Sequence, residues 1–174
     1  MFLARKINLA KWNPQSTVEE GEIAADAVTV DLRTTGNTLS FWRCDGVDDM
    51  RLKEVVLALA AGSDRIDKFD IAWLPEQEAT SQGLRVVDTD GNTPVARLVN
   101  RHADIERLDL VRLSKVARLI QSAVSEGHFR RLTRAEVQQV LITAVDAGDL
   151  SPGAVNDKLR PGLLETLEKY RTKK

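Results

Sequence analysis

Two aspartates, Asp88 and Asp90, stand two residues apart at the end of an apolar run and are followed by Gly91. Carboxylates spaced in this way at a strand end could hold Mg²⁺ while one of them attacks a phosphate. An Asp-Gly pair between two alternating apolar runs is also typical of a hairpin turn. The sequence favours the turn and leaves metal-dependent phosphoryl transfer or nuclease activity at these aspartates as an alternative.

The stretch Asp88-Thr89-Asp90-Gly91 resembles the Asp-x-Asp-Gly-Thr start of haloacid-dehalogenase-like phosphatases. This resemblance implies a magnesium-dependent phosphoryl transfer with both aspartates in the site. It covers this short stretch alone, and Asn92 displaces the threonine to position 93. The alternating strands and helices on which that fold is built do not follow in the sequence.

Other groups that carry catalysis or bind metals are scarce. Cys44 is the only cysteine, which excludes an internal disulfide and a multi-thiolate zinc site and favours a reducing cytosol. His102 and His128 do not lie in a His-x-x-x-His or Glu-x-x-His pattern. Gly-rich phosphate loops and the Gly-x-Ser-x-Gly motif are absent from the sequence. We therefore expect no cofactor and no metal, and an enzyme is the less favoured interpretation.

Charge is distributed unevenly along the chain. Residues 1–96 hold ten Lys or Arg against sixteen Asp or Glu, whereas residues 97–134 hold nine against four. A basic segment of this kind could bind nucleic acid or another anionic partner, or could contact the acidic first part. The arginines proposed for this surface are Arg97, Arg101, Arg107, Arg118, Arg130, Arg131 and Arg134.

Asp109 and Arg112 form a second charged feature. Both project onto the apolar side of their predicted helix, three positions apart, where unpaired charges would be costly. We expect them to form a structural, partly buried ion pair or to reach across to the sheet.

The first part of the chain is predicted to be rich in strands. Alternating or β-branched runs predict strands over residues 2–9, 28–33, 39–44, 68–73, 84–88 and 95–99. Residues 34–38 and 89–92 have the Gly, Asn and Asp content of hairpin connections. Residues 48–61 switch to helical spacing and are the one clear helix predicted here, ending at Gly62.

The second part is predicted to be helical. Apolar spacing predicts a helix over residues 103–125, and the Thr133 and Glu136 pair is a capping box that opens a helix reaching about Ala147. Ser151-Pro152 predicts a short helix broken at Pro161, followed by a last helix. The fold class is therefore α+β: an antiparallel sheet of about five or six strands with one helix, then a bundle of about four helices. The two parts, 1–100 and 101–174, are expected to pack as one unit.

Composition and length fit a folded protein. The chain has 174 residues, of which 43% are apolar and 29% charged, and no apolar run is long enough to cross a membrane. We expect a soluble cytoplasmic protein, of bacterial type, that acts as a non-enzymatic protein–protein interaction module or regulatory accessory protein. Its partner is expected to be another protein, with nucleic acid as the alternative and self-association left open.

Overall fold

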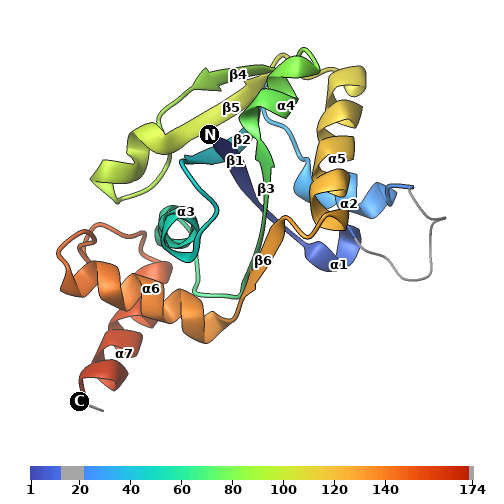
Figure 1. The fold of residues 1–174 in the computed structure, drawn as a ribbon. Coiled ribbons are helices and arrows are strands. Elements are labelled where there is room, and N and C mark those ends of the chain that lie inside the picture. Colours follow the sequence, from blue (N-terminus) through green and yellow to red (C-terminus); the bar gives the residue numbers. More distant parts are fainter. Residues whose placement is uncertain (13–21, 173–174) are drawn as a thin grey trace.

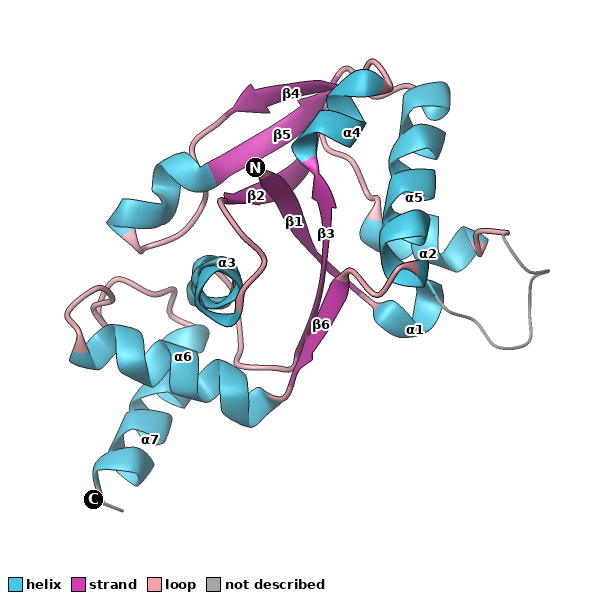
Figure 2. Ribbon diagram, in the orientation of Figure 1, coloured by secondary structure: helices cyan, strands magenta, loops and turns pink. Residues whose placement is uncertain are grey.

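One six-stranded antiparallel sheet organises the chain, with helices on both of its faces (Figure 1, Figure 2). The computed structural model describes residues 1–12 and 22–172. The spatial order of the strands is β4-β5-β2-β1-β3-β6, and every neighbouring pair is antiparallel. The strands are β1 (Phe2–Ile7), β2 (Leu39–Cys44), β3 (Phe69–Pro75), β4 (Arg85–Asp88), β5 (His102–Glu106) and β6 (Phe129–Leu132). The predicted α+β class with an antiparallel sheet is confirmed.

The helices divide between the two faces of the sheet. They are α1 (Leu9–Trp12), α2 (Ala25–Asp31), α3 (Asp49–Ala61), α4 (Glu76–Ser81), the 3-10 helix η1 (Ala96–Arg101), α5 (Leu110–Ser125), α6 (Arg134–Asp146) and α7 (Leu159–Arg171). One buried core joins the sheet to α3, α6 and α7, and a second core joins the opposite face to α1, α2, α4 and α5. Apolar side chains are therefore buried on both faces of the central strands.

Local capping explains where two predicted helices begin. The Asp48 carboxylate accepts hydrogen bonds from the backbone N–H groups of Met50 and Arg51, which starts α3. Thr133 and Glu136 form the reciprocal capping box at the start of α6. Both helices are confirmed to within one residue of their predicted limits.

Two strand predictions in the first part are wrong. Residues 28–33 lie mostly in the helix α2, and the turn at Gly36 and Asn37, both with positive φ, joins that helix to β2 instead of closing a hairpin. Residues 95–99 lie mostly in η1, and the partner of β4 is β5. A short run of alternating apolar residues fits one or two helical turns as well as a strand, so the pattern alone does not distinguish them. The first part also contains α1, α2 and α4 besides the one predicted helix.

The second part does not form a separate four-helix bundle. Its strands β5 and β6 extend the sheet at opposite sides, and α5 lies on the other face from α6 and α7 (Figure 1). Ser151 and Pro152 lie in a loop, and Pro161 lies within the first turn of α7, where a missing N–H costs no helical hydrogen bond. Among the described residues, no helix is long and apolar enough to cross a membrane.

Candidate functional site

The two aspartates singled out by the sequence lie at the exposed end of β4. Asp88 forms an ion pair with Arg43, and Asp90 lies in the following turn. In that turn Gly91 donates its N–H to the carbonyl of Val99 at 2.8 Å. Within the part of the chain that the structure describes, no group of three or more metal-ligating side chains occurs. The hairpin turn that the sequence favoured is not formed, because the chain leads from β4 into η1 and the partner of β4 is β5.

Cys44 is buried and its thiol is held in the protonated form. Its Sγ lies 3.9 Å from the Phe2 carbonyl oxygen. Burial, with a smaller contribution from Asp45, raises the pKa of the Cys44 thiol to about 11. A thiol in this environment is a poor nucleophile at neutral pH.

Most of the predicted basic surface is neutralised within the chain. Arg97 contacts both Glu54, at 2.7 Å, and Asp149, at 3.0 Å. The remaining pairs are Arg101 with Asp45, Arg107 with Glu106, Arg130 with Asp49 and Glu136, and Arg131 with Asp70. Four of these acids, Asp45, Asp49, Glu54 and Asp70, belong to the acidic first part of the chain. Contact between the basic segment and that part was one of the interpretations that the sequence left open.

The seven arginines do not converge on one surface. Arg97 and Arg130 line the same groove between α3 and α6. Arg118 lies on α5 beside α2, and Arg134 begins α6 near the start of α7. A continuous basic face along residues 97–134 is therefore not formed.

Asp109 and Arg112 meet at the start of α5. The Asp109 carboxylate accepts from the Arg112 backbone N–H at 2.7 Å and from its guanidinium at 2.6 Å. Their side chains are 55% and 45% exposed, so the pair lies at the surface. These hydrogen bonds lower the pKa of Asp109 below its ordinary value, and the residue is the N-cap of the helix. An Asp before a helical run is the sequence signal for this role.

A groove of about 560 Å³ lies between α3, α6 and the region after α6, and we call it the α3–α6 groove. Its apolar lining consists of Met50, Leu57, Leu132, Val140, Ala144 and Ala147. Its charged rim consists of Asp49, Lys53, Glu54, Arg97, Arg130, Glu136 and Asp149. The Met50 side chain is exposed at the edge of the groove. An apolar lining with charged residues beside it is typical of a protein-binding surface.

The charges of the rim compensate one another. Lys53 forms an ion pair with Asp49 at 3.0 Å. Arg97 pairs with Glu54 and Asp149, and Arg130 also pairs with Asp49. Four carboxylates face three cations, so the rim carries a small negative excess.

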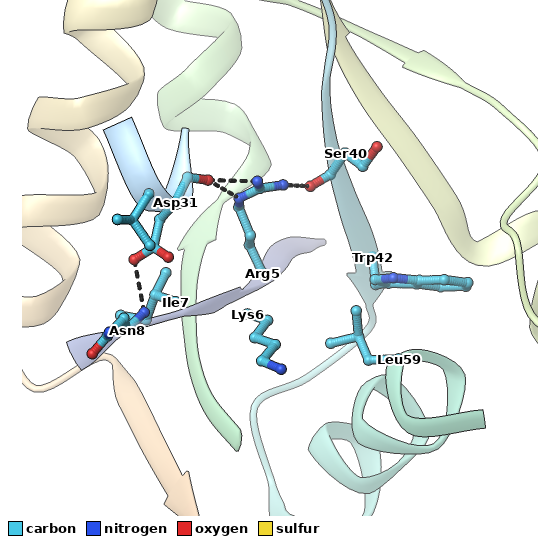
Figure 3. A pocket seen from close by; sticks show the side chains of 9 residues that line it. Arg5, Lys6, Ile7, Asn8, Asp31, Ser40, Trp42 and Leu59 are labelled. Atoms are coloured by element: carbon cyan, nitrogen blue, oxygen red, sulfur yellow. Dashed lines mark hydrogen bonds between the residues drawn. The ribbon is translucent and has the colours of Figure 1, made fainter. Parts of the chain in front are cut away.

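A second hollow lies where β1 and β2 part, and we call it the fork pocket (Figure 3). The two strands pair only from Phe2 to Ala4 against Cys44 to Trp42. Beyond that point β1 stays with β3 as far as Ile7, and β2 stays with β5 as far as Leu39. The lining residues are Arg5, Lys6, Ile7, Asn8, Val30, Asp31, Ser40, Trp42 and Leu59, around a volume of about 440 Å³.

Arg5 bridges the parted strands. Its guanidinium donates to the Asp31 carbonyl at 3.0 and 2.5 Å and to the Ser40 carbonyl at 2.5 Å. Burial lowers the pKa of Arg5 to about 10, which still leaves it charged at neutral pH, and nearby Asp31 and Asp104 oppose that shift. The side chain thus supplies hydrogen bonds to carbonyl groups at the fork.

A chain of polar side chains continues from the fork pocket across β2 and β5. Asp104 accepts hydrogen bonds from Ser40 Oγ at 2.9 Å and from Thr89 Oγ1 at 3.1 Å. Thr89 Oγ1 also lies 2.7 Å from His102 Nδ1, and the His102 ring packs edge-on against Trp42. Burial lowers the pKa of His102, against the opposing effect of Asp104. The Thr89 hydroxyl has one proton, and it donates that proton to the Asp104 carboxylate. The hydrogen bond between Thr89 and His102 therefore requires the His102 Nδ1–H to donate to Thr89 Oγ1.

Sequence reasoning missed the fork pocket because the strand order brings its residues together. Arg5, Ser40 and Leu59 are far apart in the chain, and each lies within an ordinary predicted strand or helix. The one available signal was a pair of adjacent cations, Arg5 and Lys6, within a strand that is otherwise largely buried. No protein-family model matches the chain, and neither curated proteins nor solved structures contain a significant match.

Proposed function

We propose that the chain is a non-enzymatic interaction or regulatory accessory protein whose α3–α6 groove binds an apolar and basic segment of a partner protein. The observation that carries the proposal is the apolar lining with the compensated charges of the rim beside it. Because Arg97 and Arg130 already contact carboxylates of the chain, the groove offers no concentrated positive charge. A surface of this kind suits a protein segment better than a phosphate backbone.

The lining indicates what the segment should contain. An apolar anchor that reaches Leu57 and Val140 would gain about 1.5–3 kcal/mol from burial. Gln139 and Thr143 are exposed along α6 and could hydrogen-bond the main chain of the segment. The negative excess of the rim favours a Lys or Arg beside that anchor. This combination matches the groove modes by which helices or short peptides are recognised.

Selection from a displayed library of random peptides tests the proposal. We expect enriched peptides to combine an apolar residue with a neighbouring Lys or Arg, and to bind the wild-type protein in the micromolar range. Thr143→Arg places a long cation in the groove and should weaken these peptides at least about tenfold. Ala135→Arg, an exposed residue of the same helix outside the groove, is the matched control and should leave binding unchanged. Peptides that bind Thr143→Arg as well as wild type would refute the assignment.

Nucleic-acid binding through residues 97–134 is the competing hypothesis. A phosphate approaching Arg97 would also approach Glu54 and Asp149, and this repulsion opposes binding. If nucleic acid is nevertheless the partner, affinity for a mixed-sequence duplex falls steeply as salt rises, and Arg130→Ala together with Arg131→Ala reduces that slope.

A further inference from the structure

The Lys6 ammonium group forms no ion pair within the described parts of the chain, although Asp67, Asp31 and Asp70 act on it at longer range. Its Nζ lies 4.1 Å from the centroid of the Phe69 ring, and none of the described carboxylates reaches ion-pair distance. The residue is exposed at the fork pocket, and Figure 3 shows its side chain leaving β1 on the opposite side from Arg5. Lys6 therefore presents a positive charge to whatever occupies the pocket.

Arg5 adds a second charge that no contacting carboxylate cancels. All three of its hydrogen bonds go to main-chain carbonyls of Asp31 and Ser40. The Asp31 carboxylate is engaged elsewhere, since one of its oxygens accepts from the Asn8 N–H and from Trp12 Nε1, each at 2.7 Å. The lining of the fork pocket thus holds two cations against one carboxylate that already has two donors.

The remainder of the lining is largely apolar. Trp42 of β2 and Leu59 of α3 stand together on one side, and Ile7 and Val30 also contribute (Figure 3). The Val30 side chain is exposed, although it is large and apolar. The volume of about 440 Å³ lies within the range of small-molecule sites.

We propose that the fork pocket binds a small organic anion, namely a carboxylate or phosphate group attached to an apolar, preferably aromatic, body. The anionic group would lie at Lys6 Nζ, and the body would lie against Trp42 and Leu59. A ligand of this kind contacts both the positive charge and the apolar surface of the pocket. An inorganic anion lacks the apolar contacts and a neutral aromatic compound lacks the charge contact, so each should bind more weakly. This inference concerns a different surface from the α3–α6 groove and does not depend on it.

Titration with four probes tests the proposal on the full chain. The probes are benzoate, phenyl phosphate, benzamide and inorganic phosphate, and binding is followed by the NMR signals of the tryptophan indole N–H groups and the backbone of β1 and β2. We expect at least one of the two aromatic anions to bind about tenfold more tightly than benzamide and than inorganic phosphate. Comparison of benzoate with phenyl phosphate shows which anionic group the pocket prefers.

Two variants locate the site. Lys6→Gln should weaken the aromatic anion about tenfold, whereas Lys68→Gln, an exposed lysine outside the pocket, should leave the affinity unchanged. Lys6→Arg, which retains the charge, should keep most of the binding. Equal binding of benzamide and benzoate, binding that survives Lys6→Gln, or no binding of any aromatic anion would each overturn the proposal. The comparison among probes uses the wild-type protein and therefore holds even if a variant folds poorly.

Discussion

The Arg5 guanidinium donates a 2.5 Å hydrogen bond to the main-chain carbonyl of Ser40, across the point where β1 and β2 part. A side chain thereby takes over part of the bonding that a strand ladder supplies elsewhere in the sheet. The same guanidinium binds the carbonyl of Asp31, at the last residue of α2. Arg5 of β1 thus connects β2 and α2 through hydrogen bonds.

Replacement of Arg5 should therefore destabilise the protein. We expect Arg5→Leu to lower the free energy of unfolding by about 2–4 kcal/mol, because it leaves the Asp31 and Ser40 carbonyls without these donors. Arg33→Leu, at an exposed position, should change it by less than about 0.5 kcal/mol. Urea denaturation followed by circular dichroism measures both. Equal losses for the two variants would contradict this role of Arg5.

The turn after β4 has no room for a side chain at Gly91. A Cβ there would lie 2.4 Å from a ring carbon of Trp42 and 2.9 Å from the His102 Cβ. Gly91→Ala should cost about 1–3 kcal/mol through overpacking. Gly162→Ala, where a Cβ meets nothing within 4 Å, should instead stabilise α7 by up to about 1 kcal/mol. Thermal unfolding of the two variants should shift in opposite directions.

The Cys44 thiol should react slowly in the folded protein. Because burial raises its pKa to about 11, the thiolate is a very small fraction of the population at pH 8. We expect alkylation by iodoacetamide to be at least about 100-fold slower than in the urea-denatured chain, as two pKa units imply. Mass spectrometry at timed intervals gives both rates, and comparable rates would show that the thiol is accessible.

Stability should depend on pH through His102. Its pKa is lowered in the folded protein, so the unfolded chain binds the proton more tightly. The contribution of the neutral ring is fully present above about pH 6.5, the ordinary value, and is lost as pH falls from there through the folded pKa. His102→Gln should flatten the dependence of the unfolding free energy on pH between pH 5 and 7. An unchanged slope in His102→Gln would place the dependence elsewhere.

The elements that the sequence predicts well are those set by local chemistry. The strand at 39–44 is found with the same limits, and the helices capped by Asp48 and Thr133 begin where their hydroxyl or carboxylate groups require. Residues 28–33 lie mostly in helix α2 instead of a strand, and residues 103–106, predicted to be helical, form part of β5, because tertiary packing decides the state of such short segments. Neither groove nor pocket could be predicted, since each depends on a strand or helix order that no local signal encodes.

Capture from a cell lysate after nuclease digestion, repeated with Thr143→Arg and Ala135→Arg as baits, tests the central claim most directly. The account predicts that a defined protein survives the nuclease, stays bound to the wild type and to Ala135→Arg, and is lost from Thr143→Arg. Retention of that protein by Thr143→Arg, or bound material that disappears with the nuclease, would contradict it. Loss of the bound material on nuclease digestion would instead support nucleic-acid binding by the arginines of residues 97–134.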